Sequence, residues 1–325
     1  MFLKSAGKNG TKETKNDMKR AKFIINEAAS DKEILKYTES VIGCLMMNQI
    51  VNHVDVIYTN KAEDALKEAQ KMIEGEYDFV TAVGGDGTVH DVVNGVIMGE
   101  NHTPVAIIPG GTANDFANFL GLGGSKQSFC RMIKSFETIK MDAGKVNDRY
   151  FINSAGAGLG INSAFDTSMR SKAVLGKLAY ALQSARSVSG KNMTSKARLK
   201  FTAKEFTGSM ETSVLVIRNA GSMAGSSSKN PIQTLTDGYL DVLALGTMDL
   251  LKSPGILFKL RQGKAIDHPG IKYFRTKAVD IEKEDDRIFN LDFDKERFGP
   301  LPVHIECVPE AVQILVPKSR LEIVK

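Results

Sequence analysis

Short apolar runs alternate with helical patterns over the first part of the chain. Apolar runs that have the length and composition of buried strands occupy Ala21–Asn26, Val54–Thr59, Asp78–Val83 and Val105–Pro109. A helical pattern begins at Ser30-Asp31, and a second, amphipathic one covers Glu63–Ile73. Strands that alternate with helices predict a parallel sheet whose connecting helices cover its faces.

After Ile139 the pattern becomes strand-rich. Asp142–Asn153 contains two apolar runs joined at Asn147-Asp148, a pair typical of turns. Alternating runs follow at Ala197–Ala203 and Ser213–Asn219, as expected for antiparallel strands. A last run, Ala311–Val316, should return to the first domain. A chain of 325 residues is long enough for two domains, and we expect an α/β domain followed by a strand-rich one.

Two of the predicted strands stop abruptly at glycines. Val83–His90 reads Val-Gly-Gly-Asp-Gly-Thr-Val-His, and Pro109–Phe116 reads Pro-Gly-Gly-Thr-Ala-Asn-Asp-Phe. Because glycine has no Cβ, backbone N–H groups can turn toward one point and a bulky anion can come close. Each segment suits a phosphate, although an ordinary tight turn has the same composition. Neither segment has Walker A or Gly-x-Gly-x-x-Gly spacing.

As a pair, Gly84–Thr88 and Gly111–Asp115 resemble the signatures of the diacylglycerol kinase catalytic domain family. Its superfamily also contains sphingosine kinases and NAD kinases. The resemblance implies an α/β nucleotide-binding domain with a mostly parallel sheet over 20–141 and 311–325. It also implies a β-rich, sandwich-like lipid-substrate domain over 142–310. Residues 1–19, rich in Lys, Gly, Asn and Thr, are expected to form a disordered tail.

The resemblance implies an ATP site lined by both glycine loops. Asp86 would be a catalytic residue that lies near the phosphates and supports the metal or the reacting group. Thr112 would contact phosphate, and Asn114 would hold the shape of its loop. Thr59 would lie at the nucleotide's edge, although it equally fits a strand-end hydroxyl. The implied ATP-site residues are Asn26, Thr59, Gly84, Gly85, Asp86, Gly87, Thr88, Gly111, Thr112 and Asn114.

Four residues depart from the family pattern. Glu27 stands where the family has Pro, and Lys295 stands where it has Gly. His90-Asp91 replaces the family's Asn-Glu, and we expect His90 to be a surface or cap residue. The small residues of Asn153–Gly160 either line a cleft between domains or pack tightly.

The segment Leu291–Glu296 resembles the family's Leu-x-hydrophobic-Asp-Gly-Glu. Its distance from His304-Ile305-Glu306 favours Asp294 and Glu296 as the acids that deprotonate a lipid hydroxyl. A register two residues earlier, which would select Asp292 and Asp294, remains open.

A magnesium site is implied near Asp237-Gly238-Tyr239-Leu240-Asp241, which resembles the family's Asp-Gly-x-Leu-Asp. In the family, one carboxylate and two backbone carbonyls hold a structural Mg²⁺, and oxygen ligands suit this hard cation. Carried over by position, the carboxylate is that of Asp237 and the carbonyls are those of Thr234 and Tyr239. A further Mg²⁺ would bridge the phosphates of ATP.

Charge is distributed unevenly. Between Arg170 and Lys277 there are 18 Lys and Arg residues against 6 Asp and Glu residues. Such a region could face nucleic acid, an acidic substrate or an anionic bilayer, or could simply be a solvated surface. Leu250–Lys277 alternates apolar and basic residues, which fits a membrane-surface segment or a core helix with a charged face.

Together these features predict an ATP-dependent lipid kinase, with diacylglycerol as the first acceptor to consider. We expect a lipid substrate at an anionic membrane surface and no nucleic acid, and we leave a homodimer open. Three scattered cysteines and the lack of an apolar run of about 18 residues favour a reduced, cytoplasmic protein bound peripherally to membranes. The alternatives are an NAD kinase-like enzyme with a soluble acceptor and a non-catalytic nucleotide- or lipid-binding regulator.

Overall fold

The computed structural model describes residues 18–27, 32–61, 63–158, 196–219, 234–246, 253–262, 264–294 and 296–321. These ranges leave out most of the predicted tail and the end of Asn153–Gly160. They also leave out Lys295, which stands where the family has Gly. Lys19, which was assigned to the tail, is the first residue of β1.

The first sheet begins with four parallel strands. β1 (Lys19–Asn26) lies between β2 (Val51–Thr59) and β3 (Phe79–Gly84), and β4 (Val105–Pro109) pairs with β3. All six residues of β3 are buried, because helices cover both faces of a parallel sheet. The predicted strands are therefore present, with ends shifted by a few residues.

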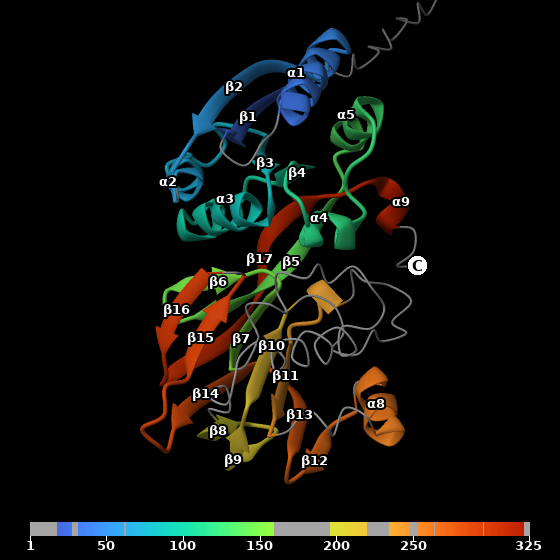
Figure 1. Ribbon diagram of the computed structural model, residues 1–325. Coiled ribbons are helices and arrows are strands. Elements are labelled where there is room, and N and C mark those ends of the chain that lie inside the picture. Colours follow the sequence, from blue (N-terminus) through green and yellow to red (C-terminus); the bar gives the residue numbers. More distant parts are fainter. Residues whose placement is uncertain are drawn as a thin grey trace, which may run out of the picture.

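Helices lie on both sides of these strands (Figure 1). They are α1 (Lys32–Met47), α2 (Asp64–Gln70), α3 (Asp86–Met98), α4 (Asp115–Leu120) and α5 (Lys126–Ser135). α2 packs against α3, and α1 packs against α5 on the other side of the sheet. The two pairs shield the parallel strands from solvent.

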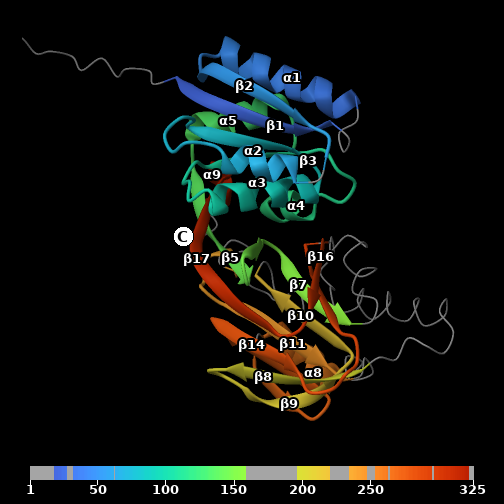
Figure 2. The same ribbon diagram turned by 90° about the vertical axis from the view of Figure 1, so that its left-hand side faces the viewer.

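Two strands, β5 (Thr138–Val146) and β17 (Val303–Leu315), run together from the parallel strands into the second part of the molecule (Figure 2). Near its end, β17 pairs in parallel with β4, where Ile314 lies opposite Val105. Its first residues pair antiparallel with β14 (Ala278–Lys283). The predicted return of the chain at 311–316 is thus the last section of a longer strand.

The rest of the first sheet is antiparallel, with β14 next to β8 (Ala197–Ala203), β8 next to β9 (Thr207–Thr212), and β6 (Arg149–Phe151) beside β5. A second, antiparallel sheet packs on it. Its order within the described residues is β12 (Ile266–His268), β13 (Ile271–Thr276), β11 (Leu240–Leu245), β10 (Val214–Arg218), β7 (Ser154–Gly158), β15 (Asn290–Phe293) and β16 (Glu296–Pro300). The predicted fold class, a mostly parallel α/β part plus a β-rich part, is confirmed.

The region Leu250–Lys277 is not one amphipathic element. Its described part contains a short helix, α8 (Pro254–Arg261), followed by strands β12 and β13. A further short helix, α9 (Lys318–Leu321), follows β17. No helix in the described part of the chain combines the length and apolar character that crossing a membrane requires.

Gly95 lies where α3 contacts α2, and its replacement tests that contact. A Cβ at Gly95 would lie 2.3 Å from the Leu66 carbonyl oxygen and 2.6 Å from the Ala69 Cβ. Gly95→Ala should therefore lower the free energy of unfolding by about 1–3 kcal/mol, because the helices must move apart. At Gly43 on α1 nothing lies within 4 Å of an added Cβ. Gly43→Ala should raise the free energy of unfolding by about 0.5–1 kcal/mol. Urea unfolding measures both, and equal changes would contradict this account.

Candidate active site

The two glycine loops contact each other through their backbones. A Cβ at Gly111 would lie 2.6 Å from the Gly85 Cα, and the Gly110 N–H donates to the Gly84 carbonyl oxygen at 2.7 Å. The loops meet because they follow adjacent parallel strands, β3 and β4, whose carboxyl ends share one edge of the sheet. The structure thus joins the two predicted motifs in one site.

Helix α3 begins inside the first loop, at Asp86, so Asp86, Gly87 and Thr88 form its first turn. A helix N-terminus presents backbone N–H groups that lack an intrahelical partner, together with a positive partial charge, which suits a phosphate. Gly87 is exposed there, whereas Thr88 is buried. At Gly84, where φ is +155°, a Cβ would lie 2.5 Å from the Thr88 Oγ1, so this position requires glycine.

Side chains hold the shape of both loops. Asn114 has a left-handed conformation with φ of 49°, accepts the Gly111 N–H at 2.8 Å and donates to the Gly111 carbonyl oxygen at 2.6 Å. These two hydrogen bonds support the expectation that Asn114 holds the shape of its loop. The Asp86 Oδ1 accepts the Phe116 N–H at 3.2 Å, so this carboxylate also ties the first loop to the second. Thr112 is exposed at the loop surface.

The ends of β1 and β2 lie next to the first loop. Asn26 Nδ2 donates to Thr88 Oγ1 at 3.1 Å, which brings the end of β1 to the start of α3. Thr59 lies opposite Asn26 in the β1–β2 register, and its buried hydroxyl donates to the Ile25 carbonyl oxygen at 3.3 Å. This is the contact of a strand-end hydroxyl, the alternative that the sequence left open.

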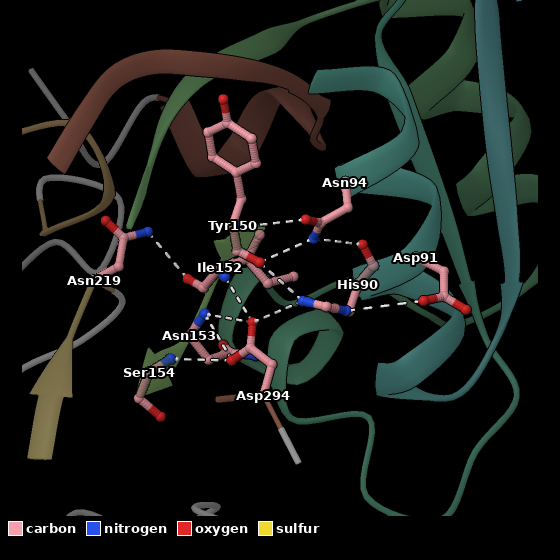
Figure 3. A network of polar contacts seen from close by, with 9 residues as sticks. All are labelled: His90, Asp91, Asn94, Tyr150, Ile152, Asn153, Ser154, Asn219 and Asp294. Carbon is pink, nitrogen blue, oxygen red and sulfur yellow. Dashed lines mark hydrogen bonds and ion pairs between the residues drawn. The ribbon is translucent and has the colours of Figure 1, made fainter. Parts of the chain in front are cut away.

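Asp294 is a buried carboxylate at the turn between β15 and β16 (Figure 3). Its oxygens accept the N–H groups of Ile152 at 2.6 Å, Asn153 at 3.2 Å and Ser154 at 3.0 Å. Burial raises the pKa of Asp294, while His90 and the three N–H groups oppose that rise. Asp294 therefore fastens the turn between β15 and β16, which we call the acidic turn, to the segment between β6 and β7.

His90 joins α3 to this turn, and the expectation that it is a surface residue is wrong. It is 3% exposed, and its Nε2 lies 2.9 Å from the Tyr150 carbonyl oxygen and 3.9 Å from the Asp294 Oδ2. Its Nδ1 lies 3.9 Å from the Asp91 Oδ1. Val89, Val92 and Val93 of α3 were the available signal, because a helix that is apolar over most of its surface is expected to be buried.

One helical turn separates His90 from Asp86, so the acidic turn lies beside the helix that begins in the first glycine loop. Asn94, one turn further along α3, donates to the Tyr150 carbonyl oxygen at 3.0 Å and accepts the Tyr150 N–H at 3.1 Å. Glu296 opens β16, and its backbone lies opposite Phe293 of β15. Asp292 lies on β15 opposite Gly156. Both registers of the catalytic acids stay open.

Sequence reasoning missed two buried polar residues of this region. Asn219 donates through Nδ2 to the carbonyl oxygens of Asp142 at 2.8 Å and Ile152 at 3.0 Å. The Asp142 carboxylate accepts the N–H groups of Gly238 at 2.6 Å and Glu310 at 3.0 Å. These partners lie far apart in the chain, so no motif in the sequence signals them.

Arg275 contacts the carboxylate of the predicted structural magnesium site. The Asp237 Oδ2 lies 2.6 Å from Arg275 Nη2, and its Oδ1 accepts the Tyr239 N–H at 3.0 Å. Arg275 also pairs with Asp241 at 3.2 Å. One oxygen of Asp237 is therefore engaged by a guanidinium, and a Mg²⁺ ion at this site stays a prediction. We derive no role from a metal at Thr234, Asp237 and Tyr239.

The family model described as "Diacylglycerol kinase catalytic domain" matches residues 20–146, which contain both glycine loops. A second, described as "YegS C-terminal NAD kinase beta sandwich-like domain", matches residues 154–316. A diacylglycerol kinase from Staphylococcus epidermidis is 31% identical over 302 residues, which cover 93% of each chain. The chain belongs to the diacylglycerol kinase catalytic domain family.

Further comparisons agree with membership of the diacylglycerol kinase catalytic domain family. A diacylglycerol kinase from Staphylococcus haemolyticus is 29% identical over 302 residues, which cover 93% of this chain and 90% of that protein. The crystal structure of a diacylglycerol kinase from Bacillus anthracis matches with a TM-score of 0.65, over 93% of this chain and 98% of the other. Because this structure is 21% identical to the chain, the match shows that the two share a fold. The resemblance stated from the paired loops is confirmed, and the family is one of lipid kinases.

Asp294→Asn tests whether this carboxylate organises the site. An amide keeps the size but turns an NH₂ group toward backbone N–H donors, so the free energy of unfolding should fall by about 2 kcal/mol. Asp280→Asn is the matched control, because the Asp280 side chain is 52% exposed and pairs with His304. That change should stay within about 0.5 kcal/mol. Thermal and urea unfolding measure both, and a neutral Asp294→Asn would refute the proposed fastening.

Proposed function

We propose that this protein is an ATP-dependent lipid kinase that transfers the γ-phosphate of ATP to a lipid hydroxyl, with diacylglycerol as the first candidate. The observation that carries the proposal is the position of the acidic turn, which contacts α3 through His90, 3.9 Å from Asp294. A phosphate at the start of α3 and an acceptor at this turn would lie about one helical turn, ~5.4 Å, apart. Such closeness is what direct transfer requires.

The two glycine loops would hold the triphosphate. Backbone N–H groups of the first turn of α3 would face its oxygens, and the loop held by Asn114 would cover the other side. Mg²⁺ bound to ATP would neutralise charge on the phosphates. Asp86 offers a carboxylate at this point, and Mg²⁺ commonly takes one or two carboxylates together with phosphate oxygens and water.

Glu296 is assigned as the base. It would accept the proton of the lipid hydroxyl while the hydroxyl oxygen attacks the γ-phosphorus in line and ADP leaves. Asp294 already accepts three backbone N–H groups and is buried, which suits positioning of the turn better than proton transfer. The product from diacylglycerol would be a phosphatidate.

Access to lipid would come from a membrane surface. On α8, Phe258 is 61% exposed and adjoins the exposed Lys259, a pairing that suits an interface between acyl chains and anionic headgroups. Peripheral binding to an anionic membrane from the cytoplasm is therefore part of the proposal. The expected lack of a nucleic-acid partner stays a prediction, and a homodimer stays open.

An NAD kinase-like reaction is the second candidate. It is favoured by the match of residues 154–316 to a family described as NAD kinase beta sandwich-like. In that case the acceptor would be soluble and no lipid would be labelled.

The first test is transfer of labelled γ-phosphate from ATP, with Mg²⁺, to diacylglycerol in mixed micelles. Glu296→Gln should lower kcat by about 10²–10⁴, because the amide cannot take the proton. Asp292→Asn is the paired variant from the same segment and should keep most of the activity.

The opposite pattern, with activity lost in Asp292→Asn and kept in Glu296→Gln, would establish the earlier register. Labelling of NAD but of no lipid would establish the second candidate. Binding of ATP without transfer to either acceptor would reject both enzymes in favour of a regulator.

Gly111→Ala tests the ATP site apart from the base. The added Cβ would lie 2.6 Å from the Gly85 Cα and would force the two loops apart. The Kd for ATP should rise at least about tenfold, which corresponds to ~1.4 kcal/mol. Gly43→Ala, on α1, should leave the Kd unchanged. Titration calorimetry measures the Kd for ATP of each variant, after melting curves have shown that the variant is folded. An unchanged Kd in Gly111→Ala would place ATP elsewhere.

A further inference from the structure

Two cysteines from different helices meet outside the active site. The Cys130 thiol on α5 donates to the Cys44 Sγ on α1, with the sulfurs 2.7 Å apart. Both are free thiols, as is Cys307 on β17. A disulfide needs about 2.05 Å between its sulfurs, so bond formation requires a further approach of about 0.7 Å.

The surrounding contacts keep the two helices together. Tyr37 of α1 donates through its hydroxyl to the Gly124 carbonyl oxygen, just before α5, at 3.0 Å. Leu45 of α1 and Ile133 of α5 are both fully buried in one hydrophobic core. Separating the helices would expose this core, so the pair of sulfurs is held in place by packing.

We propose that Cys44 and Cys130 form a site of reversible oxidation to an intramolecular disulfide. The oxidant is a small-molecule disulfide of the glutathione class. Cys44 is partly exposed and Cys130 is buried, so Cys44 is the sulfur that an oxidant reaches first. Burial and the hydrogen bond with Cys44 raise the pKa of Cys130 to about 12, which also assigns the first attack to Cys44.

The reaction balances in two steps. The Cys44 thiolate attacks one sulfur of the small disulfide, forms a mixed disulfide and releases one small thiol. Cys130 then loses its proton and attacks the Cys44 sulfur, and the second small thiol leaves with that proton. Two protein thiols lose two electrons in total, and the small disulfide is reduced to two thiols.

The new bond would close the chain between residues 44 and 130, a span that contains both glycine loops. Cross-linking restricts the unfolded chain, so the oxidised protein should melt at a higher temperature than the reduced protein. This inference does not depend on which acceptor the enzyme phosphorylates.

The experiment uses the full-length, reduced protein exposed to oxidised glutathione at about pH 8. Thiols left after denaturation are counted by mass after alkylation with N-ethylmaleimide. A tryptic digest without reductant should contain residues 37–61 joined to residues 127–131, because cleavage follows Lys36, Lys61, Lys126 and Arg131. We expect two of the three thiols to disappear and to return on treatment with dithiothreitol.

Cys307→Ser is the matched control and should give the same joined peptide and the same rise in melting temperature. Cys44→Ser and Cys130→Ser should give neither, and Cys130→Ala repeats the test with an apolar residue if the buried serine prevents folding. The proposal would be overturned if the wild type kept all three thiols. It would also be overturned if glutathione stayed on Cys44 without the joined peptide, or if the links included Cys307.

Discussion

A pair of hydrogen-bonded strands, β5 and β17, fixes the geometry on which the site depends. The chain passes between its two parts along both strands, which pair with each other over most of their length. β17 joins the parallel sheet at β4 and the antiparallel strands at β14. Because β5 and β17 pair on both sides of one irregularity, between Val308 and Val312, the two parts are held together and the acidic turn keeps its place beside the start of α3.

Where the two parts meet, buried polar side chains satisfy the backbone between β6 and β7. Asp294 accepts three N–H groups there, and Asn219, His90 and Asn94 lie against carbonyl oxygens of the adjoining residues. A buried polar group without a partner costs about 1–3 kcal/mol, so an irregular segment in this position needs such partners. The same contacts that stabilise the segment also position the proposed catalytic turn.

Charge is balanced within the chain at the place where the family resemblance implied magnesium. Arg275 lies between Asp237 and Asp241 and contacts both carboxylates. The ring of Tyr239 lies 5.2 Å from the Arg275 guanidinium and 5.5 Å from the Lys277 ammonium group. A guanidinium that pairs with two acids offsets part of their negative charge.

The sequence by itself determined the features that depend on neighbouring residues. The strand–helix alternation and the two glycine loops were readable because a few adjacent residues set the local backbone conformation, and the family resemblance of the paired loops added the role of Asn114. Only the tertiary structure decided the burial of His90, the three N–H partners of Asp294, the ion pair of Asp237 and the contact between Cys44 and Cys130. Each of these contacts joins segments far apart in the chain, and packing of the two sheets and their helices, rather than local pattern, brings them together.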